Sequence, residues 1–287
     1  MKIKRYRVDF EDTSVLKDID PDDTGGIPDK AAALELLQAG VDRLGKLQEL
    51  LYASDRYSLL LIFQGMDAAG KDSAIKHVLS GVNPQGTVVH AFKRPSEEDL
   101  AHDFMWRAVE KLPARGQLCI FNRSYYEDVV VVRVHPELLH ARRGPEQLIT
   151  PRIWEHRYEA INAFEKHLTR SGTVIRKFYM HVSREEQAQR LLARLDDPAK
   201  YWKFNLGDIV ERGHWKDYRR AWRDALAATS SSEAPWYVIP SDHKWFARVL
   251  IADIIVKTLE DLDLSLPEPE PGKLKDLEKA RRILKRA

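Results

Sequence analysis

The chain has 287 residues, 44% of them hydrophobic and 31% charged, which is the balance of an ordinary soluble globular protein long enough to bury a sizeable core. Its 46 basic and 44 acidic residues nearly cancel, to a formal net charge of +2, so we expect no nucleic-acid partner and only a local basic patch for any polyanion. No apolar run reaches the roughly 18 residues that span a bilayer, and the first residues lack the apolar core of a signal peptide, so we expect no membrane contact and a cytoplasmic location.

Residues 1–29 are predicted to form a polar N-terminal arm, because they are rich in the turn-forming residues Asp, Gly and Pro. This arm shows no core of its own, so we expect it to pack on the surface. Residues 30–53 repeat leucine and valine every three or four positions, as an amphipathic helix does. Residues 59–63 follow as five consecutive apolar side chains, the pattern of a parallel strand that is covered on both faces.

The segment 65–73, GMDAAGKDS, is typical of a phosphate-binding loop that joins this strand to a helix. Gly65 is followed after four residues by Gly70 and Lys71. This spacing turns backbone N–H groups towards an anion, places the positive end of the next helix behind it and adds a mobile cation. The alternative is a glycine turn with an incidental lysine. We predict phosphate contacts from the loop residues Gly65, Ala68, Ala69, Gly70, Lys71, Asp72 and Ser73.

Two acidic residues distinguish this loop from the usual pattern. Asp72 occupies the position directly after the lysine, where a Ser or Thr usually binds magnesium, and Ser73 comes one place later. Asp67 lies inside the loop, where a carboxylate repels anions unless a divalent cation lies between them. We therefore predict that Asp67 binds Mg²⁺.

Beyond the loop, predicted helices and strands alternate to about residue 263. Expected strands cover residues 87–92, 117–121, 173–182 and 236–239, and expected helices cover residues 71–82, 96–110, 151–170, 183–196 and 245–262. With the central strand, this alternation predicts a doubly wound α/β fold, in which a five-stranded parallel sheet carries helices on both faces. The single cysteine, Cys119, falls in an expected strand, so we predict that it is buried and has no catalytic role.

Residues 264–287 are predicted to form a proline-rich spacer and then a basic helix, outside the main domain of residues 30–263. A basic terminus of this kind is either a solvated helix or a nucleic-acid tail, and we favour the solvated helix.

A polar cluster, NRSYYED, follows the expected strand 117–121. Arg123 is suited to grip a phosphoryl group with two donors at once, and Glu127 offers a carboxylate close by. Because the carboxyl ends of parallel strands meet at one edge of a sheet, we expect this cluster to converge with the phosphate loop. We predict that Asn122, Tyr126 and Glu127 contact phosphate or nucleotide and that Glu127 is a second metal ligand. A charged surface loop is the alternative.

Residues 194–223 carry eight basic side chains interleaved with six aromatic ones. They could form a solvated helical hairpin whose aromatic residues pack on the core. We favour a mobile lid that brings cations over a phosphate chain and excludes water, since Pro198, Gly207 and Gly213 supply possible hinges. The basic residues expected to line the phosphate site are Arg94, Arg123, Arg133, Arg194, Lys203 and Arg212.

Taken together, GMDAAGKDS, FNRSYYEDV, RLDDPAKYWKF and DIVERGHWKDY resemble the motifs of the polyphosphate kinase 2 family, over roughly residues 30–262. The resemblance implies a thymidylate-kinase-like fold with a phosphate-binding loop and Mg²⁺-dependent transfer of the terminal phosphoryl group of inorganic polyphosphate to a nucleotide. It also implies roles for four residues. Asp67 would hold magnesium, Lys71 would bind the transferring phosphate, Arg123 would stabilise it and Arg194 would reach over it.

Two positions depart from the commonest family pattern, in which FDRS is followed by a tyrosine and an asparagine. This chain has Asn122 in place of the aspartate, and Glu127 in place of the asparagine. The glutamate form resembles the subgroup often called class III, which accepts both AMP and ADP. The resemblance thus implies adenine nucleotides as partners, with guanine nucleotides as a second option, and a homo-oligomer.

Three other functions compete with this one. The enzyme could phosphorylate ADP only, or it could be a nucleoside monophosphate kinase that uses ATP and binds a second adenine on the donor side. The chain could also be a binding protein without catalysis, which the presence of Asp67, Lys71, Arg123 and Arg194 argues against.

Overall fold

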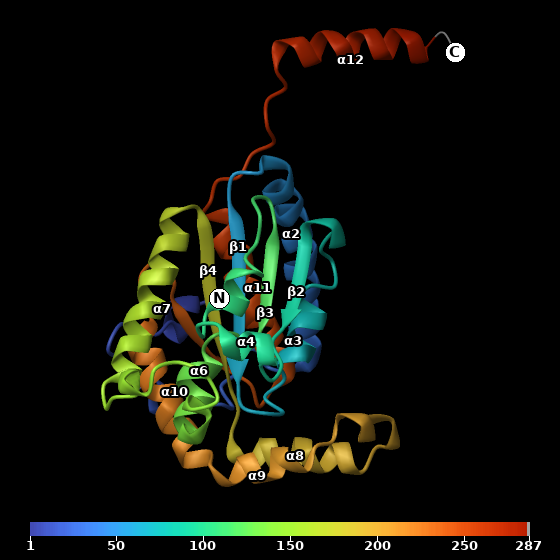
Figure 1. Ribbon diagram of the computed structural model, residues 1–287. Helices are drawn as coiled ribbons and strands as arrows, with labels where there is room; N and C mark the ends of the chain where they lie inside the picture. The colour runs from blue at the N-terminus through green and yellow to red at the C-terminus, as the bar shows by residue number, and fades with distance from the viewer. Residues whose placement is uncertain (286–287) are drawn as a thin grey trace.

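The computed structural model describes residues 1–285, without the side chains of Lys203 and Pro271. Its centre is a five-stranded sheet in the order β2-β3-β1-β4-β5, and all the pairings are parallel (Figure 1). This sheet confirms the predicted doubly wound α/β fold. The strands are β1 (Ser58–Gly65), β2 (Thr87–Ala91), β3 (Leu118–Asn122), β4 (Thr173–His181) and β5 (Trp236–Pro240).

The central strand β1 determines where a ligand can bind. Its residues 59–63 are completely buried, as the continuous apolar run predicts. It pairs with β3 on one side and with β4 on the other. From β1 the chain runs to β2 and β3 on the first side, and it then crosses over to β4 and β5 on the second side. In doubly wound sheets a crevice opens at the carboxyl ends of two such strands.

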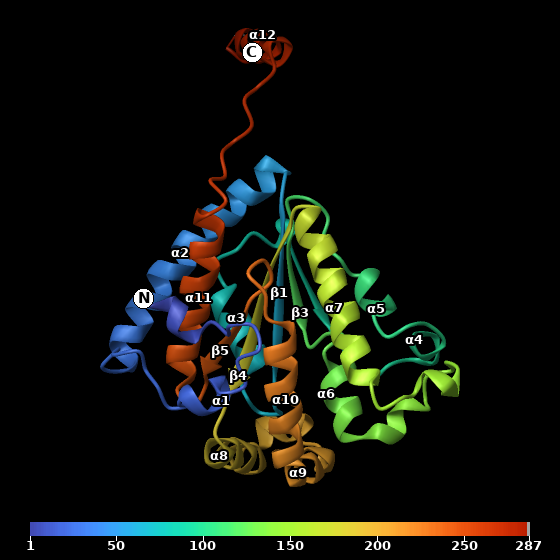
Figure 2. The same ribbon diagram turned by 90° about the vertical axis from the view of Figure 1, so that its left-hand side faces the viewer.

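Helices form a layer on each face of the sheet (Figure 2). On one face α11 packs against α2 and α3, and on the other α10 packs against α6 and α7. These helices are α2 (Lys30–Ser54), α3 (Lys71–Val78), α6 (Glu127–Val134), α7 (Ile153–Arg170), α10 (Trp215–Thr229) and α11 (Lys244–Glu260). The shorter or outlying helices are α1 (Val15–Asp18), α4 (Glu97–Ala101), α5 (Trp106–Val109), α8 (Arg184–Leu195), α9 (Leu206–Gly213) and α12 (Pro271–Leu284), with 3₁₀ turns η1 (Ile3–Tyr6), η2 (Pro84–Gly86), η3 (Pro136–Leu139), η4 (Glu146–Leu148) and η5 (Pro198–Lys203).

The prediction of a single helix over residues 96–110 is wrong, because two short helices, α4 and α5, occupy this range. Ser96 caps α4 as predicted, through a capping box with Asp99, but the helix ends at Ala101. His102 is extended, and the side chain of Asp103 accepts a hydrogen bond from the backbone N–H of Met105 at 2.9 Å. Such a local bond from an aspartate competes with the helical hydrogen bonds, and α5 starts only after it.

The N-terminal arm lies on the body of the domain, but it also contributes to the core. Tyr6, Val8, Val15, Leu16 and Ile19 are all buried. The backbone N–H of Val8 donates to the carbonyl of Trp236 at 2.9 Å, so the arm covers part of β5, which is an edge strand. The arm thus packs on the domain and has no separate core, and its buried side chains belong to the main core.

The predicted lid splits into two parts. The helices α8 and α9, with η5 between them, cross the carboxyl ends of the strands (Figure 1). The following helix, α10, belongs to the body, because Tyr218, Ala221 and Trp222 are buried in the main core. The predicted end of the lid at residue 223 therefore lies too far along the chain. The aromatic residues of α10 pack on the core, as in the alternative of a helical hairpin.

The C-terminal helix α12 extends away from the domain, and its described side chains are exposed (Figure 1). Arg286 and Ala287 lie outside the described residues. Cys119 is buried in β3, as predicted. Within residues 1–285, none of the helices combines the length and the apolar character that crossing a membrane requires.

Candidate active site

The loop between β1 and α3 has the backbone of an anion site. Gly65 has a φ of 146°, and a Cβ at this position would lie 2.8 Å from the carbonyl oxygen of Met180. Gly70 has a φ of 105° at the start of α3. These two conformations strongly favour glycine and turn the loop back over the helix N-terminus, where backbone N–H groups face a bound anion.

Lys71 points back into this loop. Its Nζ donates to the carbonyl oxygens of Gly65, at 2.6 Å, and Met66, at 3.2 Å, and its side chain is almost fully buried. Burial, together with the nearby Arg123, lowers the pKa of Lys71 to about 8. The loop therefore holds a cation that a bound phosphate would stabilise.

Arg123 joins the second strand end to the loop. Its Nη2 lies 2.8 Å from Oδ1 of Asp67, and its Nη1 lies 3.2 Å from Oε2 of Glu127. These carboxylates, Glu127 first, raise the pKa of the guanidinium. The expected convergence of the loop with the cluster after β3 is therefore confirmed.

The short helix α9 adds a carboxylate that the sequence analysis missed. Oδ2 of Asp208 lies 3.1 Å from Nη1 of Arg194, at the end of α8. Burial and the neighbouring Asp67 raise the pKa of Asp208 above its ordinary value. Asp208 is the first residue of the DIVERGHWKDY segment, one of the motifs that resemble the family, but no role was predicted for it.

Two side chains of α8 support the loop from outside, and they were also missed. Arg190 is buried and donates to the carbonyl oxygens of Ala68, at 3.1 Å, and Ala69, at 2.9 Å. Gln187 donates to the carbonyl oxygen of Asp67 at 2.9 Å. These bonds fix the conformation of the loop. A polar pair three residues apart on one helix face was the available signal.

Two cavities meet at this site. A cavity of about 890 Å³, the basic cavity, is bordered by the phosphate loop and by the basic residues Lys71, Arg190, Arg194, Lys200 and Lys244. A cavity of about 530 Å³, the apolar cavity, has a mostly apolar lining that includes Val130, Leu138, Tyr218 and Trp222. The residues that border both cavities are Asp67, Phe92, Lys93, Arg123, Asn205 and Asp208. Two ligands bound side by side would thus meet at Asp67 and Arg123.

Residues 29–266 match the family model for polyphosphate kinase 2 (PPK2). The chain belongs to the polyphosphate kinase 2 family. It is 49% identical over 251 residues to an ADP-polyphosphate phosphotransferase of Rhodopseudomonas palustris, covering 87% of each chain. It is 45% identical over 269 residues to an AMP/ADP-polyphosphate phosphotransferase of Meiothermus ruber, covering 93% of this chain and 97% of the relative. The crystal structure of polyphosphate kinase 2 from Arthrobacter aurescens TC1 superposes with a TM-score of 0.86 at 39% identity, covering 96% of this chain and 95% of that one.

Most of the predicted site residues of this polyphosphate kinase 2 chain border one of the cavities. Asp67 and Arg123 border both. Those at the basic cavity alone are Ala68, Ala69, Gly70, Lys71, Asp72, Ser73, Asn122 and Arg194. Those at the apolar cavity alone are Gly65, Arg94, Glu127 and Arg212. The side chain of Lys203 lies outside what the structure describes.

Two predicted site residues lie away from both cavities. Tyr126 is completely buried, because the turn at the start of α6 directs its ring into the core, and its hydroxyl donates to Glu165 at 2.8 Å. Arg133 lies 2.8 Å from Asp224 and donates to the hydroxyl of Tyr158 at 3.0 Å, so it ties α6 to α10 and α7. The predictions for Tyr126 and Arg133 are therefore wrong.

The carboxylates beside Arg123 are too few to hold a magnesium ion by themselves. Within residues 1–285, no group of three or more His, Cys, Asp or Glu side chains is arranged to hold a metal ion. Mg²⁺ in kinases, however, uses one or two protein carboxylates and takes its other ligands from phosphate and water. Asp67 and Glu127 both contact Arg123, so they lie close together beside the loop. This donor set fits a Mg²⁺ ion held jointly with a bound phosphate.

Proposed function

We propose that this chain transfers the terminal phosphoryl group of inorganic polyphosphate to AMP or ADP in a Mg²⁺-dependent reaction. The observation that carries the proposal is the meeting of a basic and an apolar cavity at Asp67 and Arg123. The names of the relatives in Rhodopseudomonas palustris and Meiothermus ruber support polyphosphate as the donor and adenine nucleotides as the acceptors.

Polyphosphate is assigned to the basic cavity. A chain with about one negative charge per phosphate needs a local basic surface, as nucleic-acid backbones do. Lys71, Arg194, Lys200 and Lys244 supply such a surface in a protein whose net charge is only +2. The nucleotide is assigned to the apolar cavity, where apolar side chains can enclose a base and Arg94 and Arg212 can contact its phosphates.

The transfer itself needs no covalent nucleophile from the protein. A terminal phosphate oxygen of the acceptor forms a bond to the end phosphorus of polyphosphate, and the bond from that phosphorus to the shortened chain breaks. Lys71, Arg123 and Arg194 orient the reacting groups and balance their charge. A Mg²⁺ ion held by Asp67 and Glu127 would neutralise phosphate charge. The α8 and α9 segment excludes water, which protects the donor from hydrolysis.

The proposal extends to the setting of the reaction. The family resemblance suggests a homo-oligomer, and AMP and ADP are metabolites of the cytoplasm, so we place the enzyme there. The domain proposal is a kinase domain of residues 30–263 with an inserted lid, which begins near Arg194 at the end of α8 and continues through η5 and α9.

The test is an assay of protein, MgCl₂, AMP and polyphosphate without ATP, followed by separation of the nucleotides. We expect ADP, and then ATP, to appear. A parallel assay with ADP as the starting acceptor distinguishes an enzyme that uses ADP only. Formation of ADP from AMP only when ATP is added would identify an ordinary nucleoside monophosphate kinase and refute the proposal.

A further inference from the structure

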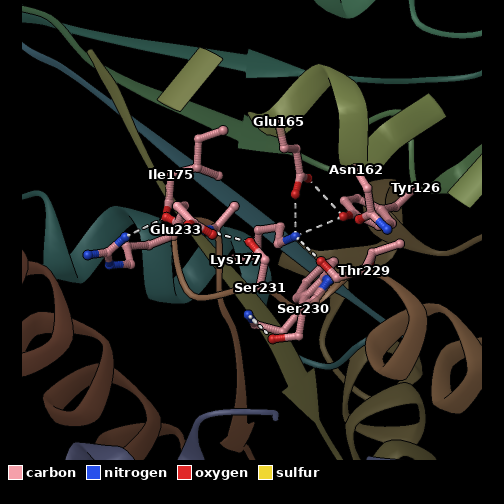
Figure 3. A network of polar contacts seen from close by, with 12 residues as sticks. Tyr126, Asn162, Glu165, Ile175, Lys177, Thr229, Ser230, Ser231 and Glu233 are labelled. Carbon is pink, nitrogen blue, oxygen red and sulfur yellow. Dashed lines mark hydrogen bonds and ion pairs between the residues drawn. The ribbon is translucent and has the colours of Figure 1, made fainter. Parts of the chain in front are cut away.

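A buried ion pair between Lys177 and Glu165 lies next to Tyr126, the residue that directly precedes Glu127 (Figure 3). Lys177 on β4 is completely buried, and its Nζ lies 2.5 Å from Oε2 of Glu165 on α7, which is also buried. The same ammonium donates to the carbonyl oxygen of Thr229 at 2.7 Å and to the hydroxyl of Tyr126 at 3.0 Å. All three of its hydrogens thus have acceptors. Neither Glu165 nor Lys177 borders the two cavities.

The pair holds the two tyrosines that precede Glu127. Oε1 of Glu165 accepts a hydrogen bond from each hydroxyl, of Tyr125 and of Tyr126, at 2.8 Å. Both rings are completely buried, and burial raises the pKa of both hydroxyls well above the ordinary value, so they remain donors. The start of α6 is therefore fixed from inside the core.

The other side of the turn is under conformational strain. Arg123 has a φ of 65°, in the left-handed region that residues other than glycine rarely adopt. Such a conformation persists only where the neighbouring residues determine it. Ser124, the next residue, accepts hydrogen bonds from Gln64 and from the backbone N–H of Tyr126, both at 3.2 Å. The tyrosines complete this restraint, because they anchor the two following positions.

The pair also reaches the other wall of the apolar cavity. Thr229 is the last residue of α10, whose Tyr218 and Trp222 line that cavity. The ammonium of Lys177 binds both Tyr126 and Thr229. The turn that carries Arg123 and Glu127 is therefore anchored at the same point as α10. Neither position could be recognised from the sequence, since a lysine in a strand and a glutamate in a helix are usually exposed.

Stability alone is a weak reason for such a pair. The free energy needed to remove two charges from water offsets much of their electrostatic attraction. Apolar residues of similar volume can therefore often replace a buried ion pair without loss of stability. Hydrogen-bonded charges do, however, fix directions, which apolar contacts cannot do. We propose that Glu165 and Lys177 are positioning residues, which act through Tyr125 and Tyr126 to hold Arg123 and Glu127 in the orientation for phosphoryl transfer. This inference rests on the proposed function.

The first test removes the hydroxyl links and leaves the ion pair in place. Tyr126→Phe is expected to lower kcat at least about fivefold, and Tyr125→Phe/Tyr126→Phe more, with the KM for polyphosphate within about twofold of the wild-type value. Tyr6→Phe is the matched control, because Tyr6 is equally buried and donates to the carboxylate of Asp23 at the same distance, 2.8 Å, but lies on the N-terminal arm. A kcat for Tyr126→Phe equal to that of Tyr6→Phe would overturn the inference.

A second test asks whether the ion pair acts through the tyrosines. Glu165→Leu/Lys177→Met replaces the pair by apolar residues, and we expect a loss of kcat similar to that of Tyr125→Phe/Tyr126→Phe. Combining all four substitutions should then add little, because both pairs of changes break the same links. Fully additive losses would show independent effects and would contradict the inference. If the Leu/Met variant does not fold, the comparison of Tyr126→Phe with Tyr6→Phe decides. Wild-type protein assayed alongside separates the two proposals, since its failure to use polyphosphate would refute the proposed function itself.

Discussion

The lysine of the phosphate loop gives the sharpest prediction about pH. Burial, followed by the charge of Arg123, lowers the pKa of Lys71 to about 8 from an ordinary value of 10.5. The ammonium form, which is the form proposed to bind phosphate, is therefore half populated at about pH 8 in the free enzyme and declines above that pH. We expect kcat/KM for polyphosphate to fall above this pH, approaching about tenfold per pH unit for a single ionisation, because this constant reports groups of the free enzyme.

Two further effects follow with a definite sign. A bound phosphate chain stabilises the ammonium, so the fall in kcat should come at a higher pH than the fall in kcat/KM. In the unfolded chain Lys71 keeps its proton up to its ordinary pKa of 10.5, so between about pH 8 and this value the unfolded state binds more protons than the folded state. The contribution of Lys71 to the free energy of unfolding should therefore rise with pH across this window, by roughly 3 kcal/mol in total.

The assay is the initial rate of ADP formation from AMP and polyphosphate, measured between pH 6.5 and about 9.5 at constant free Mg²⁺. Lys71→Arg is the matched control, because a guanidinium keeps its charge throughout this range. We expect that variant to be slower and its pH profile to lose the alkaline limb. A wild-type kcat/KM that stays level to the alkaline end, or an unchanged limb in Lys71→Arg, would refute the assignment of the limb to Lys71.

Three substitutions test other groups of the candidate site. Asp67→Asn should abolish transfer and leave thermal unfolding nearly unchanged, since it removes the proposed metal-binding charge from a partly exposed loop position; near wild-type turnover would contradict the magnesium role. Arg194→Ala should lower kcat more than about tenfold with little change in the KM of the nucleotide, whereas weaker binding at unchanged kcat would assign it to ground-state binding only. Glu127→Asn should change the ratio of kcat/KM for AMP and ADP by more than about fivefold, or roughly 1 kcal/mol, and equal losses for both acceptors would reject its role in acceptor choice.

The parts of the fold that the sequence predicted well are those set by local patterns. The apolar run at residues 59–63 marks the central strand, and the glycine spacing from Gly65 to Gly70 marks the loop that follows it. The meeting of Asp67 and Arg123 could also be predicted, although they are 56 residues apart, because parallel strands end at one edge of the sheet. A contact between residues far apart in the sequence could thus be predicted, because the topology of a parallel sheet brings the ends of its strands together.

The predictions that failed concern whether a side chain lies in the core or faces the solvent. Tyr126 directly precedes two acidic residues in the sequence, yet it is completely buried, because Glu165 and Lys177 provide partners for its hydroxyl. Trp222 lies among the basic residues from which a lid was predicted, yet it packs in the main core. In both cases the partners come from elements far along the chain, and periodicity within one helix contains no information about them.

The two contacts of Arg123 suggest how the donor and acceptor sites are coupled. Its guanidinium is planar and rigid, so the nitrogen that faces Asp67 and the nitrogen that faces Glu127 cannot move independently. Asp67 borders both cavities, whereas Glu127 borders only the apolar one. A phosphate that enters the basic cavity and competes with Asp67 for this guanidinium must also alter the contact with Glu127, on the side of the acceptor. Because the strained backbone of Arg123 is anchored from the core, we expect that alteration to be a side-chain rearrangement at the junction, where the proposed function places the two substrates.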